Sequence, residues 1–213
     1  MDATVKIEKI TVTKKGRYAI FCGGEFLFSV DEETFIKHHI KEGSVLTREE
    51  LECLRAASDY FSAKNKALEL LGYRDHSRKE LTDKLKRKFD EETSRLAVEK
   101  MCELRLVDDR EFARKLAAEL IEGRGQSKRA AAQKLYEKGV AKELIEEALA
   151  EYEDDETDAI RALVEKKYMT KLADKDKRQT VFASLMRRGF KSENIKEVLR
   201  EFPYKETEDE YFD

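Results

Sequence analysis

The segment at residues 77–89 recurs twice along the chain at intervals of 50 residues. One position of this repeat is apolar in all three copies, and so is the position four residues later: Leu81, Ala131 and Val181, then Leu85, Leu135 and Leu185. Apolar residues four positions apart lie on the same face of a helix. A spacing kept through three copies predicts an amphipathic helix used three times in a tandem-repeat fold.

The composition favours the same fold class. The chain of 213 residues has one proline and nine glycines, so few residues would interrupt helices. Hydrophobic residues make up 40% of the chain, enough for thin cores that neighbouring repeats would share on stacking. We therefore expect a mainly α fold with three tandem three-helix repeats in an elongated, curved array. The expected helices cover residues 59–72, 77–88 and 91–104, then 108–121, 127–138 and 142–152, then 156–168, 174–188 and 192–202.

The N-terminal region follows a different pattern. Between Val5 and Val30, apolar residues mostly alternate with polar ones, which is typical of half-buried strands. Gly16 ends a predicted turn, and Gly23 and Gly24 separate two β-rich runs as in a tight hairpin. We expect a small antiparallel sheet of three strands that packs on the following helices, and then a short helix over residues 31–39.

Helix-start signals divide the next part of the chain. Thr47 and Glu50 form a capping-box pattern that begins a helix, and Ser77 and Glu80 form another. Ser58 is interpreted as the start of a separate second helix. Gly139 and Gly189 follow the middle helices of repeats two and three, where glycine commonly ends a helix. Repeat one has no such glycine and is predicted to be one residue shorter.

These signals predict five segments. Residues 1–45 form the N-terminal hairpin region with its short helix, and residues 46–107 form a linker helix and repeat one. Repeat two covers residues 108–153 and repeat three covers residues 154–202. Residues 203–213 form a polar, acidic tail that we expect to be disordered or loosely held.

Charge and residue usage exclude several classes of protein. Charged residues make up 42% of the chain, and residues 64–200 have a net charge of +4 beside an acidic C-terminal end. Three widely spaced cysteines, the lack of a long apolar run and the absence of a signal-peptide pattern predict a cytoplasmic protein with reduced thiols and no membrane span. No phosphate-binding loop, zinc motif or nucleophile motif is present, so we expect no enzyme activity and no metal site.

Basic residues recur at both ends of the middle helix. Lys88, Lys138 and Arg188 fall near its C-terminal end, where they would neutralise the helix dipole. A partner contact is the alternative. Arg78, Lys128 and Arg178 fall at its beginning, where the dipole disfavours a cation, so they are candidates for binding a partner.

Other basic residues are predicted to point outward and to form a strip along the repeats. The candidate binding residues are Tyr73, Arg74, Arg78, Lys79, Lys86, Arg87, Arg124, Lys128, Arg129, Arg178, Arg187 and Arg188. Such a strip suits a protein filament, a DNA backbone or an acidic groove. The alternative is ordinary solubilising charge.

Several segments together resemble one protein family. Residues 67–74 with Ser77, Leu81 and Leu85 resemble the first repeat of RecX regulatory proteins, and residues 106–113 resemble the most recognisable segment of that family. Lys128-Arg129, Leu135 and residues 138–140 continue the likeness. The N-terminal strands up to residue 33 are similar to longer members from Gram-positive bacteria. The likeness covers nearly the whole chain except the acidic tail.

The resemblance implies a function that the composition does not. RecX proteins modulate the recombinase RecA: they lie in the groove of its filament on single-stranded DNA and inhibit its recombinase, ATPase and co-protease activities. The family therefore implies roles in DNA repair, recombination and the SOS response, without a cofactor. We expect a monomer whose partners are the RecA filament and DNA, single- or double-stranded. The alternatives are a DNA-binding helical module that is independent of RecA, and a general protein scaffold.

Overall fold

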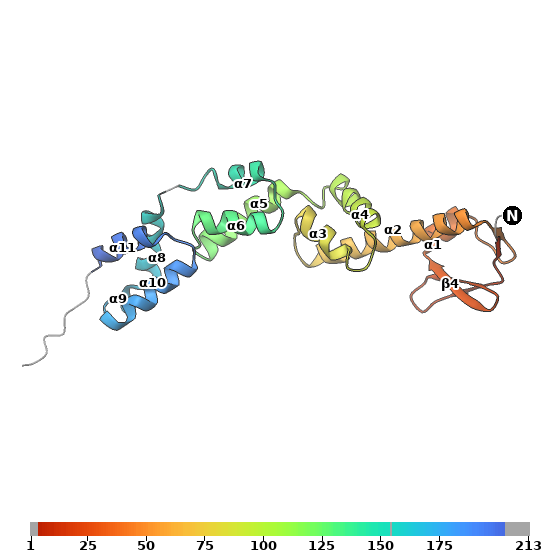
Figure 1. Ribbon diagram of the computed structural model, residues 1–213, viewed down its shortest axis with the longest axis horizontal. Coiled ribbons are helices and arrows are strands. Elements are labelled where there is room, and N and C mark those ends of the chain that lie inside the picture. Colours follow the sequence, from red (N-terminus) through yellow and green to blue (C-terminus); the bar gives the residue numbers. More distant parts are fainter. Residues whose placement is uncertain (1–3, 154, 203–213) are drawn as a thin grey trace, which may run out of the picture. The chain divides into compact units, whose positions relative to one another are not determined.

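The computed structural model describes residues 4–153 and 155–202 of the chain (Figure 1). These residues are mostly helical, with three-helix repeats that follow a small antiparallel sheet, so the predicted fold class is confirmed in these respects. The predicted curvature of the array stays a prediction. The chain divides into two compact units, Met1–Asp108 and Asp109–Asp213, which are described separately. The predicted acidic tail lies outside the described residues.

The first unit begins with the predicted three-stranded sheet and one unpredicted pair of strands. Antiparallel pairing gives the order β2-β3-β4, and Gly23 and Gly24 connect the last two strands with φ of 59° and 76°. Both angles lie where glycine is favoured, which explains the hairpin signal. The strands are β1 (Val5–Lys6), β2 (Lys9–Val12), β3 (Tyr18–Cys22), β4 (Glu25–Val30) and β5 (Val45–Leu46). The pair β1-β5 was not predicted because β5 is only two residues long.

One face of this region is covered by helices. The short helix α1 (Glu32–Lys37) begins at Asp31, whose carboxylate accepts a 2.8 Å hydrogen bond from the Thr34 amide. Tyr18 of β3 stacks on Phe35 of α1 with ring centroids 4.0 Å apart. The buried cluster beneath them consists of Ile7, Ile20, Phe28, Val30, Ile40 and Leu54. The sheet therefore packs on the following helices, as expected.

The helix that follows is continuous, and the predicted break at Ser58 is wrong. Helix α2 (Arg48–Tyr73) begins with the complete capping box of Thr47 and Glu50 and runs for 26 residues, from the sheet region to α3 and α4 in Figure 1. Ser58 is buried within it, and its hydroxyl donates to the Ser29 carbonyl oxygen at 2.9 Å. The same hydroxyl accepts a 2.6 Å hydrogen bond from Arg17. Ser58 thus holds the sheet to the helix and does not cap a helix.

Each repeat consists of helices that surround a middle helix. Repeat one combines the later part of α2 with α3 (Arg78–Leu85) and α4 (Glu91–Glu103). Repeat two contains α5 (Asp109–Ala118), the π-helical turn η1 (Glu119–Gly123), α6 (Lys128–Glu137) and α7 (Lys142–Leu149). Repeat three contains α8 (Glu156–Lys167), α9 (Met169–Leu172), the 3₁₀ turn η2 (Lys175–Lys177), α10 (Arg178–Arg187) and α11 (Ser192–Glu201).

The apolar positions of the repeat are buried as predicted. All six side chains are 0% exposed: Leu81, Leu85, Ala131, Leu135, Val181 and Leu185. The expectation of a core shared between repeats is wrong, because the buried residues form one cluster in each repeat. Each three-helix unit therefore buries its own small core.

The predicted one-residue difference between repeats is confirmed. Ser77 and Asp90 precede α3 and α4 and lie 13 positions apart, whereas Ser127 and Ala141 precede α6 and α7 and lie 14 apart. The additional residue is Gly139, with φ of 75°, and Gly189 has φ of 90° at the same place in repeat three.

The predicted helix at residues 174–188 is shorter than expected. The Asp174 side chain accepts a hydrogen bond from the Asp176 amide at 3.0 Å and begins the 3₁₀ turn, so α10 itself starts at Arg178. The unpredicted helix α9 fills the interval before it. Leu172 of α9 is 2% exposed and belongs to the core of repeat three, which explains why this link is ordered into a helix.

Candidate partner-binding surface

The predicted binding residues of repeat one lie at its surface. Tyr73 ends α2 with 79% of its surface exposed. Arg74 follows it and binds Glu80 of α3 with both terminal nitrogens, at 2.9 and 2.7 Å. This hydrogen-bonded pair raises the pKa of Arg74 above its usual value. Arg74 therefore ties α2 to α3, and its charge is largely matched by a neighbour.

Helix α3 and the turn after it carry four further candidates. Lys79 pairs with Asp83 at 2.9 Å and Lys86 pairs with Glu91 at 2.5 Å. Arg78 is also exposed, at the first position of α3. Arg87 is exposed and has no ion pair or hydrogen bond through its side chain within residues 4–153 and 155–202. Arg87 is the candidate in repeat one whose charge is most available to a partner.

The basic residues at the beginning of α6 and α10 have partners inside their own repeats. Lys128 donates to the carbonyl oxygen of Tyr152 at 2.7 Å, just beyond the end of α7. Arg178 donates to the carbonyl oxygens of Leu199 and Phe202 at the end of α11. Carbonyl groups at the C-terminal end of a helix lack intrahelical donors, so a cation there satisfies them. Their recurrence thus has a structural explanation that the sequence analysis missed, and partner binding through them stays a prediction.

Arg129 and Arg188 connect repeats two and three. Arg129 donates to the Gly189 carbonyl oxygen at 2.7 Å, and the Ser127 amide donates to the Arg188 carbonyl oxygen at 2.9 Å. The guanidinium of Arg188 in turn donates to the carbonyl oxygen of Arg124. A Cβ atom on Gly189 would lie 2.6 Å from the Cβ of Ala130, so glycine permits this close approach.

The helix-dipole interpretation of the basic residues after the middle helices needs correction. Helix α3 ends at Leu85, so Lys88 lies in the following turn, with its ammonium 5.7 Å from the Phe89 ring centroid. Lys138 and Arg188 are the C-cap residues of α6 and α10, as the interpretation requires. The Arg188 side chain, however, extends to the carbonyl of Arg124 beyond the π-helical turn of the preceding repeat. The three residues therefore do not share one role.

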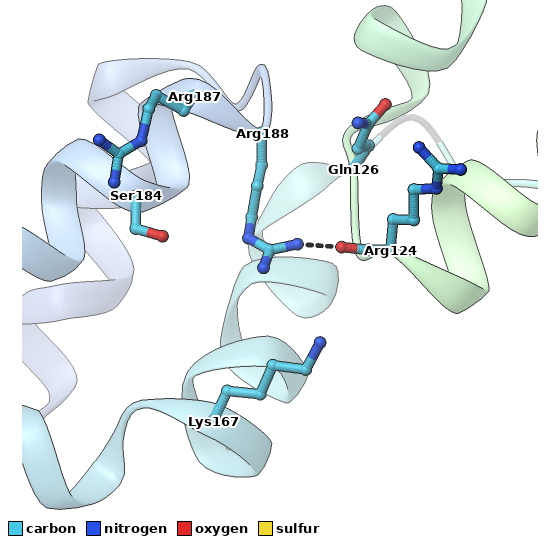
Figure 2. A pocket seen from close by; sticks show the side chains of 6 residues that line it. All are labelled: Arg124, Gln126, Lys167, Ser184, Arg187 and Arg188. Carbon is cyan, nitrogen blue, oxygen red and sulfur yellow. Dashed lines mark hydrogen bonds between the residues drawn. The ribbon is translucent and has the colours of Figure 1, made fainter.

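A basic pocket of about 460 Å³ lies in the second unit, where repeats two and three meet. Figure 2 shows its lining residues, with Lys167 of α8 and Arg188 extending toward the Arg124 segment. The lining residues are Arg124, Gln126, Lys167, Ser184, Arg187 and Arg188. Four of the six are cations and none is a carboxylate. Arg124 also forms an ion pair with Glu119, a carboxylate that does not line the pocket.

A buried tyrosine, Tyr168, contacts one of the residues that line this pocket. The Tyr168 hydroxyl lies 2.7 Å from the Ser184 hydroxyl, and Arg188 also forms a hydrogen bond with it. Burial raises the pKa of Tyr168, but these hydrogen bonds and the charges of Arg188 and Lys167 outweigh burial, so its pKa lies below the usual value. The side-chain oxygen of Gln126 is buried and has no hydrogen-bond partner within the described part of the chain.

Half of the residues that line this pocket were predicted from the sequence. Arg124, Arg187 and Arg188 were predicted candidates, whereas Lys167, Ser184 and Gln126 were not. The missed residues come from three separate segments with no spacing in common, so no linear pattern marks them. Lys167 could have been proposed from its position in the last turn of α8, next to the buried Tyr168.

Within residues 4–153 and 155–202, no three side chains of histidine, cysteine, aspartate or glutamate gather closely enough to hold a metal ion. Each helix in the same residues is too short or too polar to cross a membrane. Cys22, Cys53 and Cys102 are free cysteines.

Four sequence models of one family match successive parts of the chain. They are described as the regulatory protein RecX N-terminal domain, at residues 5–47, and the first, second and third three-helix domains of RecX, at residues 63–101, 108–149 and 153–199. The matches follow the order of the sheet region and the three repeats along the chain.

Individual relatives agree with these matches. Regulatory protein RecX of Lactobacillus gasseri is 32% identical over 211 residues, which cover 96% of this chain and 77% of that protein. Regulatory protein RecX of Listeria monocytogenes serotype 4a is 31% identical and covers 92% of this chain and 76% of that protein. A crystal structure of a regulatory protein RecX has a similar fold, with a TM-score of 0.62, 24% identity and coverage of 91% of this chain and 98% of that one. RecX from Lactobacillus salivarius has a TM-score of 0.56 at 25% identity and covers 68% of this chain and 97% of that one.

Proposed function

The chain belongs to the RecX family of regulatory proteins, and we propose that it regulates the recombinase RecA by binding the RecA filament on single-stranded DNA. Binding inhibits the recombinase, ATPase and co-protease activities of RecA, and so modulates recombination, DNA repair and the SOS response. The observation that carries this proposal is the match of four successive family domains to the sheet region and the three repeats.

The architecture is compatible with regulation by binding alone. Each repeat has its own buried core and displays charged side chains at intervals of 50 residues. Exposed cations such as Arg87 and Arg187 have no side-chain partner within the described residues, so they can pair with acidic groups of another macromolecule. A regulator of this kind acts in proportion to its amount and carries out no chemistry. Our proposal places it in the cytoplasm as a monomer.

Cosedimentation with preassembled filaments tests the proposal. RecA on single-stranded DNA is pelleted in the presence of equimolar protein, and we expect the protein to pellet with it. Arg87→Gln should weaken binding, because Arg87 has no described side-chain partner inside the protein. Arg48→Gln is the matched control, since Arg48 pairs with Glu52 on an exposed part of α2. Protein that stays in the supernatant with wild-type filaments would contradict the proposal.

A second candidate function is DNA binding that does not require RecA. The basic pocket of the second unit favours it, because four cations line one recess. Binding that neutralises phosphates weakens steeply as salt concentration rises. A salt titration of DNA binding with and without RecA distinguishes the two functions: strong salt-dependent binding by the protein alone supports the second, and binding seen only with RecA supports the first.

A further inference from the structure

The basic pocket concentrates positive charge that the described residues of the second unit neutralise only in part. Lys167 and Arg187 are exposed, and neither has an ion pair or side-chain hydrogen bond in the described part of the chain. Arg188 is directed to a carbonyl oxygen and a tyrosine hydroxyl, and both are uncharged groups. Among the four cations, Arg124 has a described carboxylate partner, Glu119. The recess therefore keeps a net positive charge that favours an anion.

The position of the central cation is fixed before any ligand arrives. Arg188 is anchored to the Arg124 carbonyl, and its neighbour Gly189 packs against Ala130 and accepts a hydrogen bond from Arg129. On the other side, Tyr168 is 8% exposed and hydrogen-bonded to Ser184. A cation that is already held in place loses little conformational entropy on binding, which increases the affinity for a ligand.

The lining also limits the chemistry of the ligand. None of the six described lining residues has an aliphatic or aromatic side chain, so the recess offers little surface to an apolar ligand. A tetrahedral phosphate presents several oxygens in different directions, and arginine and lysine are the side chains that most often bind it. The lining residues come from α8, from α10 with its C-cap, and from the loop after η1. Donors from several elements suit the several oxygens of a phosphate better than the two oxygens of a planar carboxylate.

We propose that this pocket is a phosphate-binding site, with Lys167, Arg187 and Arg188 as its charged ligands and the Ser184 hydroxyl as a further hydrogen-bonding group. The phosphate comes either from a nucleic-acid strand or from a free polyphosphate, and the recess recognises the group common to both. The site goes beyond regulation of RecA and gives the DNA-binding candidate a location. Its test contains no RecA, so a negative result would leave the proposed regulation of RecA unaffected.

Calorimetric titration with tripolyphosphate tests the site in the full-length protein. The double variant Lys167→Gln/Arg187→Gln removes two pocket cations that have no described partners, so the fold should be preserved. The control Lys166→Gln/Lys196→Gln removes two exposed cations outside the pocket lining and gives the same net charge. We expect the pocket variant to bind tripolyphosphate about tenfold more weakly than the wild type, and the control to bind like the wild type. Equal weakening in both variants would overturn the site.

Two further arms identify the kind of anion and its source. Citrate is a multivalent carboxylate, and citrate binding as tight as that of tripolyphosphate would overturn the preference for phosphate. A thymidine oligonucleotide of about 20 residues is then titrated against the complex with tripolyphosphate. Displacement of tripolyphosphate from the wild-type protein assigns the site to a nucleic-acid strand, whereas failure to displace it assigns the site to free polyphosphates. Oligonucleotides of different sequence should compete equally, because contacts to phosphates carry no sequence information.

Discussion

The Arg129 guanidinium donates a 2.7 Å hydrogen bond to the carbonyl oxygen of Gly189, 60 positions later in the chain. This bond joins the first turn of α6 in repeat two to the turn after α10 in repeat three. The buried apolar residues of the two repeats form separate clusters, so this junction depends in part on hydrogen bonds to main-chain carbonyls. Several basic residues of the repeats therefore stabilise the protein itself, and the remainder are the better candidates for binding a partner.

Gly189 should be sensitive to any larger side chain. Gly189→Ala places a Cβ atom 2.6 Å from Ala130 at a backbone φ of 90°. We expect a loss of about 2–4 kcal/mol in the free energy of unfolding, from overpacking and from the left-handed conformation together. Gly43→Ala is the control, because Gly43 has a φ of 88° with nothing within 4 Å of its added Cβ, and it should cost about 1 kcal/mol. Equal losses in urea unfolding would show that the close packing contributes nothing.

Arg178 should stabilise repeat three by capping α11. Arg178→Met keeps most of the side chain but removes its hydrogen bonds to the carbonyl oxygens of Leu199 and Phe202. Hydrogen bonds from charged donors contribute about 1.5–3 kcal/mol, so unfolding should begin at clearly lower urea concentration. Arg187→Met on the same helix removes an exposed cation without a described partner and should change little. An Arg178→Met protein as stable as the control would show that the cap is not stabilising.

Ser58 should act in tertiary structure rather than at a helix boundary. Ser58→Ala removes its hydrogen bonds with Arg17 and with the Ser29 carbonyl oxygen. We expect a loss of about 1–3 kcal/mol for the first unit, with unchanged helical circular dichroism, since Ser58 lies inside α2. Cys53→Ala, at an exposed position of the same helix, is the control. Reduced helicity in Ser58→Ala would mean that the serine does begin a helix.

His76 should make the first unit less stable in mild acid. The side chain is 3% exposed, its Nδ1 lies 2.9 Å from the Arg74 carbonyl oxygen, and its Nε2 has no partner within the described residues. Burial lowers the pKa of His76. The unfolded chain therefore binds the proton more readily, so stability is full above about pH 6.5 and falls as the pH drops below it. Urea unfolding at pH 7.5 and pH 5.5 should show this loss, and His76→Gln should reduce it. The same pH dependence in both proteins would exclude His76 as the cause.

The sequence predicted the parts of the fold that repeat or that follow local rules. Leu85, Leu135 and Leu185 revealed the repeat because burial of one helix face imposes a fixed spacing. Thr47 and Gly23-Gly24 were recognised because caps and tight turns require particular residue types over a few positions. Ser58 misled the prediction because a serine that caps a helix and a serine that bonds a distant strand look alike in sequence.

The candidate site was harder to predict. Lys128 and Arg178 bind main-chain carbonyls, and every residue type supplies those, so no sequence pattern marks the partner. Lys167 and Arg187 are 20 positions apart on different helices and line the same recess only through the packing of repeat three. Exposure alone therefore selects too many basic residues, and the structure is needed to identify those with a partner inside the protein.

The DNA-dependent ATPase rate of RecA tests the proposed function most directly. RecA is assembled on single-stranded DNA, and ATP hydrolysis is followed as the full-length protein is added up to an equimolar amount. The proposal predicts a rate that falls as the protein is added, with weaker inhibition by Arg87→Gln than by the control Arg48→Gln. An ATPase rate that is unchanged at the equimolar point would contradict it.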